Sequence, residues 1–294
     1  MKLDPVTLRL FVSVIEEGTI AGAAKREHIA AAAVSKRLSE LEELLDSKLL
    51  NRSNKGISPT DAGLSLLYMA RGALNNLNEI VVQMREFSSG RRGSVHVLAN
   101  ISAITQFMPQ LMHSFLASNP LINITLEEKP SLSIVQEIAD NSADIGVFTS
   151  LPHSVSVEVF PFRVDRLILI VPLNHPLACR QSVKFSETLD HHYIVLRSGT
   201  HLNFQLIKAA NDLGRSLRKR MEVSSYDALC LMVQANLGIG ILPEGSARIY
   251  KMEGAKFVHL DEVWARRELN LCIRSSESLS LASKLFLDHL RGKA

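Results

Sequence analysis

The spacing of apolar residues changes near residue 90, and this change constrains the fold more than any other feature. Before it, apolar residues recur at the three- and four-residue steps of helices. After it, short apolar or alternating runs typical of strands take turns with helical segments. Residues 88–93 between them are small, polar and glycine-bearing, as in a linker. We therefore expect a helical N-terminal domain and a larger α/β domain, which suits a chain of 294 residues.

The N-terminal residues predict three helices in close succession. Apolar positions at helical spacing occupy 8–15, a short helix capped by Thr19 covers 19–27, and a longer amphipathic helix follows over 30–45. Alanines 23 and 24 allow two helices to approach closely, which is typical of a helix-turn-helix. Residues 51–58, with Arg52 and Lys55, indicate an exposed hairpin, or wing. The prediction is a winged helix-turn-helix over residues 1–60.

A long helix is expected over 61–87, within a linker and dimerisation segment at 61–92. Its apolar residues follow a heptad-like seam: Leu67, Ala70, Leu74, Leu77, Val81 and Met84. So long a helix with one apolar stripe needs a partner, and we expect it to pair with a second copy in a homodimer. The alternative is that the stripe packs on its own domain.

The remainder, residues 93–294, predicts two α/β lobes. Strands at 95–97, 122–126 and 145–148 alternate with helices at 107–116 and 134–139, which indicates a parallel-rich sheet. Strands at 166–171 and 193–196 with helices at 203–213 and 226–236 form a second unit, before a strand at 269–273 and a helix at 279–290. We place lobe 1 at about 93–161 and 266–294 and lobe 2 at about 162–265. A ligand cleft is expected between them.

Several motifs resemble those of the LysR-type transcriptional regulators, and the resemblance covers the whole chain. They are Leu8, Phe11, Val14, the run 17–20, Ala23, Ala24, the run 33–38, Leu41, Glu42, the run 49–52, the run 60–63, and the segments at 172–177 and 238–243. The resemblance implies a bacterial regulator of transcription with a type-2 periplasmic-binding-protein-like effector domain, dimerised through the long helix and usually tetrameric. The chain departs from the family at Ile20, Glu27, Leu50 and alanines 30–32, where Phe, Leu, Phe and Ser or Gln are common.

The DNA-reading surface is expected on the third helix and the wing. A recognition helix presents its N-terminal residues to base edges in the major groove. Alanine there makes no bidentate hydrogen bond but contacts a thymine methyl. The candidate DNA-binding residues are Ala31, Ala32, Ser35, Lys36, Arg37, Arg52, Lys55 and Thr60. The net charge of only +3, and 13 basic against 11 acidic residues in 1–92, exclude a purely electrostatic binder.

The effector site is expected where polar residues follow strands or begin helices. Helix N-termini carry unpaired amides and a positive dipole end, which suit an anion. By position, six residues resemble effector-contacting positions of the family: Asn100, Ser102, Ser131, Thr149, Ser198 and Thr200. We expect a small, carboxylate-bearing effector. The alternative is that these residues are ordinary helix caps, and His201 is expected to be a surface or cap histidine.

Other classes of protein fit the sequence poorly. The Gly238-Ile239-Gly240 segment lacks the third glycine of a dinucleotide fingerprint, and no nucleophile-elbow, zinc-protease or P-loop pattern occurs. The three cysteines have no metal-site spacing. We therefore expect no enzyme activity, metal or cofactor. Without a signal-peptide core or an apolar run near the roughly 18 residues of a membrane helix, the expected location is the cytoplasm, away from membranes.

Overall fold

The computed structural model describes residues 3–53, 56–88, 93–250 and 253–292, without the side chains of residues 79 and 82–88. The chain divides into two compact units: Met1–Arg91 with Asp140–Ser142, and Arg92–Ala139 with Ala143–Ala294. None of the helices in the described ranges is long and apolar enough to cross a membrane.

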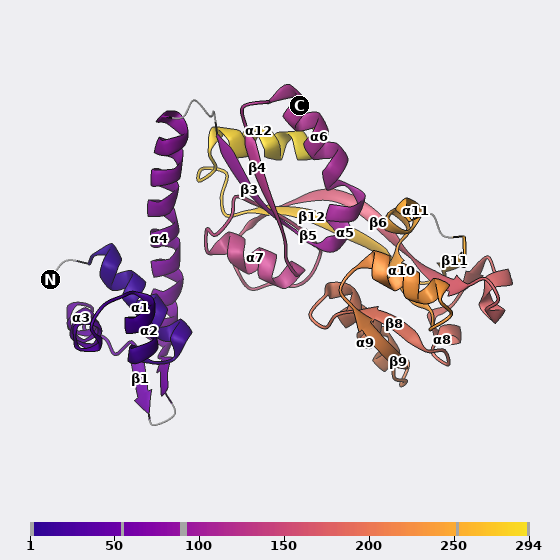
Figure 1. Ribbon diagram of the computed structural model, residues 1–294, viewed down its shortest axis with the longest axis horizontal. Coiled ribbons are helices and arrows are strands. Elements are labelled where there is room, and N and C mark those ends of the chain that lie inside the picture. Colours follow the sequence, from indigo (N-terminus) through magenta and orange to yellow (C-terminus); the bar gives the residue numbers. More distant parts are fainter. Residues whose placement is uncertain (1–2, 54–55, 89–92, 251–252, 293–294) are drawn as a thin grey trace. The chain divides into compact units, whose positions relative to one another are not determined.

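The first unit is a winged helix-turn-helix followed by a long helix (Figure 1). Its elements are α1 (Pro5–Glu17), α2 (Ile20–Arg26), α3 (Ala31–Leu44), β1 (Leu50–Ser53), β2 (Gly56–Pro59) and α4 (Asp61–Ser88). Helix α1 begins where the Asp4 carboxylate accepts hydrogen bonds from two backbone amides, and α2 begins at the Thr19 cap. The predicted wing is confirmed, because β1 and β2 pair antiparallel.

A buried carboxylate joins helix α3 to the wing. Glu42, on α3, accepts hydrogen bonds from the amides of Leu49 and Leu50 at 2.8 and 3.2 Å, and it is only 8% exposed. Two amides that would otherwise lack acceptors are thus satisfied at the start of β1. The position of the wing therefore depends on one side chain of α3.

Glu27, which stands where the resemblance leads one to expect Leu, has polar partners that explain it. The buried Ser13 hydroxyl donates to its carboxylate at 2.5 Å, and the Arg9 guanidinium lies 3.2 Å away. Since both partners come from α1, the contact ties the end of α2 to α1, and the Glu27 carboxylate is paired.

The predicted seam of α4 is divided between two environments. Leu67 and Ala70 are buried in the core of their own unit, and Leu74 packs against it. Packing on the own domain, the alternative considered above, is therefore correct for this half. Further along, Leu77 and Val81 are 42% and 49% exposed. The side chain of Met84 lies outside the described residues.

In lobe 1 of the second unit, helices cover both faces of a sheet (Figure 1). The strands are β3 (Ser94–Ala99), β4 (Asn123–Glu128), β5 (Ile145–Thr149), and parts of β6 (Glu158–Pro172) and β12 (Arg266–Ile273). Alternation along β3 sends Val97 toward α6 (Met108–Ser118) and α12 (Leu281–Leu290), and Leu98 toward α7 (Ser131–Ala139). A short helix, α5 (Ile101–Gln106), follows β3 and was not predicted.

Lobe 2 packs its helices around the second half of β6. It contains β7 (Ser182–Val183), α8 (Phe185–Thr188), β8 (Tyr193–Leu196), α9 (His201–Asp212), β9 (Lys219–Val223), α10 (Tyr226–Gln234), β10 (Gly240–Pro243), α11 (Glu244–Ile249), β11 (Ala255–Leu260) and two short 3-10 turns, Pro176–Cys179 and Val263–Ala265. The sheets are mixed rather than parallel-rich. Strand β3 pairs parallel with β4 and β5, whereas β6 pairs antiparallel with β10, β11 and β12.

Two strands connect the lobes, and a buried ion pair joins them at the crossing. Strand β6 runs for 15 residues: its first part pairs with β12 in lobe 1, and its last part pairs with β10 and β11 in lobe 2. At the change of partner, Asp165 and Arg267 face each other across the two strands. The Arg267 guanidinium donates to both carboxylate oxygens, one bond being 2.9 Å, and both residues are at most 5% exposed. Gln106 also donates to Asp165 at 3.0 Å.

Replacing Glu42 with Ala should destabilise the first unit by about 2–3 kcal/mol, because two buried amides lose their acceptor. Urea unfolding followed by helical circular dichroism measures this loss. Trp264, the one tryptophan of the chain, reports the second unit, so its fluorescence transition should not move. The exposed neighbour Glu43 provides a matched control, and equal effects of Glu43→Ala and Glu42→Ala would contradict the assignment.

Replacing Arg267 with Met should cost about 3–5 kcal/mol, because Asp165 is then a buried charge without its partner. The Trp264 fluorescence transition in urea measures the loss. Adding Asp165→Leu to the same chain should restore most of the stability, since an apolar pair replaces the ion pair. A double variant that is no more stable than Arg267→Met alone would show that the pair does not hold the crossing together.

Candidate functional site: a recognition helix and an effector pocket

The exposed start of α3 is made of alanines. Ala31 and Ala32 are exposed together with Ala30 and Ala33, and Ala30 makes no side-chain capping bond. This turn of α3 therefore presents methyl groups, which offer a ligand only shape and apolar contact.

The predicted basic residues differ in how free they are. The Lys36 side chain is 79% exposed, with Glu40 3.9 Å away, and Arg52 is exposed on β1. The Arg37 guanidinium instead donates to the Thr7 hydroxyl at 2.9 Å and to Asp4 at 3.3 Å, at the start of α1. The side chains of Lys36 and Arg52 thus extend into solvent, whereas the Arg37 side chain is held against the start of α1. Lys55 lies outside the described residues.

Two further candidates lie on the same unit. The Thr60 hydroxyl donates to the Lys48 carbonyl at 2.7 Å and accepts from the Gly63 amide at 3.0 Å, so it acts as a helix cap and would offer a phosphate only nearby amides. Ser35 is partly buried on α3, next to Lys36.

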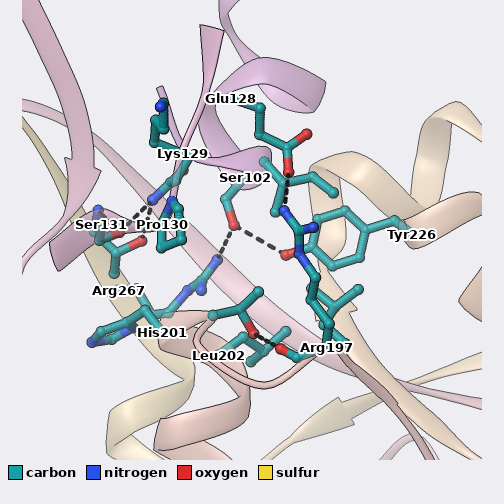
Figure 2. Close-up of a pocket in the computed structure, with 15 residues that line it drawn as sticks. Ser102, Glu128, Lys129, Pro130, Ser131, Arg197, His201, Leu202, Tyr226 and Arg267 are labelled. Atoms are coloured by element: carbon teal, nitrogen blue, oxygen red, sulfur yellow. Dashed lines mark hydrogen bonds and ion pairs between the residues drawn. The ribbon is translucent and has the colours of Figure 1, made fainter. Parts of the chain in front are cut away.

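A pocket lies between the two lobes of the second unit (Figure 2). It is partly open to solvent. Its lining comprises Asn100, Ile101, Ser102, Glu128, Lys129, Pro130, Ser131, Thr149, Leu196, Arg197, Thr200, His201, Leu202, Tyr226 and Arg267. Five of the six predicted effector residues are therefore brought together, and Ser198 is not among the lining; its hydroxyl donates to Glu222 at 3.0 Å.

Asn100, Ser131 and Thr149 form a buried hydrogen-bonded cluster at one wall. The Asn100 amide donates to the Ser131 and Thr149 hydroxyls at 3.0 and 2.9 Å, and the Thr149 backbone amide donates to Ser131 at 3.2 Å. The Ser131 oxygen thus accepts two hydrogen bonds, which uses both of its lone pairs. Its proton remains to be donated, and no acceptor for it is found among the described side chains of this cluster.

Ser102 belongs to the network of the strand crossing. Its hydroxyl accepts from Arg267 at 3.1 Å and lies 3.1 Å from the Tyr226 hydroxyl, at the first residue of α10 (Figure 2). Since Ser102 comes from lobe 1 and Tyr226 from lobe 2, this contact joins the lobes at the base of the pocket. Burial raises the pKa of Tyr226, so its hydroxyl stays protonated.

Thr200 serves as the cap of α9, as in the alternative considered from the sequence. Its hydroxyl donates to the Arg197 carbonyl at 3.1 Å and accepts from the Asn203 amide at 3.3 Å. Its neighbour His201 is not simply a surface residue. It lines the pocket, and its buried Nδ1 atom has no hydrogen-bond partner among the residues that the structure describes. Burial, and then the charge of Arg267, lower the pKa of His201, which favours the neutral imidazole.

Four charged residues of the lining were missed: Glu128, Lys129, Arg197 and Arg267. Glu128 ends β4 and Arg197 follows β8, so the strand-end rule that selected Asn100 also applied to them. Charged residues at the ends of strands are usually exposed to solvent, so the rule was applied only to small polar residues. Arg267 was missed because its strand was expected to start at residue 269, three residues after its observed start at Arg266.

Comparison with known proteins agrees with this architecture. The LysR substrate binding domain model matches residues 88–294, and the model of the bacterial regulatory helix-turn-helix protein, lysR family, matches residues 6–64. The RuBisCO operon transcriptional regulator of Allochromatium vinosum is 25% identical over 289 residues, 98% of this chain and 95% of that protein. The transcriptional activator CmpR of Synechocystis is 22% identical, over 96% of this chain and 92% of that one.

Solved structures share the fold. CbnR, a LysR family transcriptional regulator, superposes with a TM-score of 0.68 at 20% identity, over 99% of both chains. The regulatory domain of Synechocystis CcmR in complex with 2-PG gives 0.63 at 20% identity, over 68% of this chain and 97% of that one. The effector binding domain of QuiR with shikimate gives 0.58 at 22% identity, over 67% and 95%. The chain belongs to the LysR family: it is a DNA-binding transcriptional regulator with an effector-binding domain.

Proposed function

We propose that this regulator binds its operator as a dimer or tetramer and that a small anion in the pocket between its lobes changes how it does so. The observation that carries the proposal is the wall at Ser131, where a buried hydroxyl has both lone pairs occupied and a proton left to donate. Such a group is suited to an acceptor, and a carboxylate is an acceptor only. As a regulator of transcription, the protein acts in the cytoplasm.

The electrostatics of the pocket support an anion. Among its described lining residues, Lys129, Arg197 and Arg267 carry positive charge and Glu128 carries negative charge. The amino ends of α7 and α9 begin at Ser131 and His201, both in the lining. Helix amino ends add partial positive charge there. The effectors of similar folds, 2-PG in CcmR and shikimate in QuiR, are consistent with a small acid.

Operator recognition would combine phosphate contacts with apolar contacts. The exposed Lys36 and Arg52 hold phosphates, and the methyls of Ala31 and Ala32 contact thymine methyl groups in the major groove. Bending of the DNA would supply the rest of the specificity. CbnR has been solved in complex with its target DNA, with a TM-score of 0.67 to this chain at 21% identity.

Pairing of two copies would use the free half of α4. Leu77, Ile80 and Val81 are 42%, 59% and 49% exposed, and they follow the half of the helix that is packed on its own unit. Burying this stripe against a second copy would remove apolar surface from water and place two recognition helices on one operator.

Replacing Lys36 with Ala should weaken binding to the DNA upstream of its own gene and lower the salt slope by about one, because one phosphate contact is lost. Arg37→Ala should lower the slope less, since its guanidinium is held by Thr7 and Asp4. Equilibrium binding at several salt concentrations, against a scrambled duplex, measures both. If Lys36→Ala left affinity and slope unchanged while Arg37→Ala lowered both, the assignment would be reversed.

The proposed contacts of Ala31 and Ala32 are tested on the DNA. Substituting deoxyuridine for thymine in the duplex removes only methyl groups and should weaken binding. Unchanged affinity would exclude contacts between the alanines and thymine methyl groups.

Replacing Ser131 with Ala should reduce the thermal stabilisation that small acids give the protein, because the donor at the wall is lost. A panel containing shikimate and short mono- and dicarboxylates would be screened by thermal shift on the full-length chain. The control is Ser198→Ala, whose hydroxyl lies outside the pocket lining and pairs with Glu222. Equal loss in the two variants, or no loss in Ser131→Ala, would remove Ser131 from the site.

A further inference from the structure

We propose that Glu128 is a built-in competitor of the effector: it occupies Arg197 across the pocket mouth, and the effector binds by taking Arg197 from it. The inference rests on the proposed anion site and specifies its charge. It assigns Arg197 as an effector-binding residue and Glu128 as the residue from which the effector must take it.

The cations of the lining are not equally available. Arg267 is held by Asp165 through two hydrogen bonds in a nearly solvent-free environment. The Lys129 ammonium lies 2.9 Å from Glu127 and 3.5 Å from Glu137. Each of them is already neutralised by carboxylates at close range, and drawing Arg267 away from Asp165 would leave a buried carboxylate unpaired.

Arg197 is held far more loosely. Its guanidinium lies 3.9 Å from the Glu128 carboxylate, which is beyond hydrogen-bond distance, and the two side chains are 57% and 43% exposed. An ion pair so exposed contributes little stability. Arg197 is therefore the cation of the pocket that an anion can recruit at the smallest cost.

The backbones of the two partners are fixed although their side chains are not. Glu128 is the last residue of β4, in register with Ala99 on β3, and so belongs to lobe 1. In lobe 2, the amide of Arg197 donates to Val223 and its carbonyl accepts from Thr200. Figure 2 shows the two side chains meeting from these opposite sides. The Glu128–Arg197 contact across the pocket mouth can therefore be broken by side-chain rotation, without movement of either strand.

The exchange makes ligand charge decisive. Among the described lining residues Glu128 is the only acid, and it stays beside the site after it is displaced. A monoanion exchanges one carboxylate for another at Arg197 and has no charge left for the Ser131 wall. A dianion pairs with Arg197 through one group and meets the Ser131 hydroxyl and the amino end of α7 with the other. The expected effector class is therefore small dicarboxylates and phosphorylated acids.

Succinate and its monoamide succinamate test this, because they match in size and differ by one charge. Calorimetric titration of the full-length protein at low salt should show succinate binding at least about fivefold more tightly. Glu128→Gln should tighten the binding of both ligands about fivefold, since a nearby negative charge and a competitor for Arg197 are removed. Arg197→Gln should weaken succinate binding about tenfold and reduce the effect of a second Glu128→Gln substitution, because only the repulsion by Glu128 is then left to remove.

Glu127→Gln is the matched control, because this adjacent carboxylate pairs with Lys129 and is absent from the lining. It should leave the affinity for both ligands unchanged. The inference is overturned if Glu128→Gln does not tighten succinamate binding, or if it acts equally in the Arg197→Gln chain. Succinate binding that depends on Ser131 but not on Glu128 would overturn this inference alone. Binding of neither ligand to the wild-type protein would overturn the anion site as well.

Discussion

The antiparallel pairing of β6 with β12, closed by the Asp165–Arg267 ion pair, is the contact on which the effector domain depends. Both lobes are built on β6, which exchanges β12 for β10 and β11 as it leaves lobe 1. The ion pair lies at this exchange, and Gln106 and Ser102 of α5 complete its hydrogen bonds. A buried pair of this kind adds little stability over apolar residues, but it fixes the place where the lobes meet and hence the pocket beside it.

The polar groups around the pocket serve two purposes that the structure separates. Most of the small hydroxyl and amide groups hold the walls together: Asn100 links two hydroxyls, Thr200 caps α9, and Ser102 joins Tyr226 to Arg267. Fewer groups can still bind a ligand: the Ser131 hydroxyl can donate its proton, the His201 Nδ1 atom has no partner among the described residues, and Arg197 is only loosely paired. A ligand would be held by this second set and shaped by the first.

The features predicted well from the sequence are those that depend on local pattern. The helix-turn-helix, the wing and the alternation of strands and helices follow from periodicity and capping, and the structure confirms them. The long course of β6 was not predicted, because the charged Arg163, Asp165 and Arg166 interrupt its apolar run. These charged residues are accommodated in the strand because they pair with β12, which lies about a hundred residues later in the sequence.

The same reason explains which parts of the site were missed. Asn100, Ser131 and Thr149 were predicted because each directly follows a strand or begins a helix. Glu128 and Arg197 occupy equivalent places, but a charged residue at a strand end looks like ordinary surface until the opposite lobe is known. The division of the α4 seam likewise depends on α1, which covers Leu67 and Ala70 and not the later turns.

Hydrogen exchange of the full-length protein with and without succinate tests the central claim, that a small anion binds between the lobes at the amino ends of α7 and α9. The account predicts that succinate slows exchange at amides 131–133 and 201–203 and leaves exchange in the wing at residues 50–59 unchanged. In Ser131→Ala, succinate should no longer slow exchange at the two helix ends. Protection that appears elsewhere in the chain, with none at these two helix ends, would contradict it.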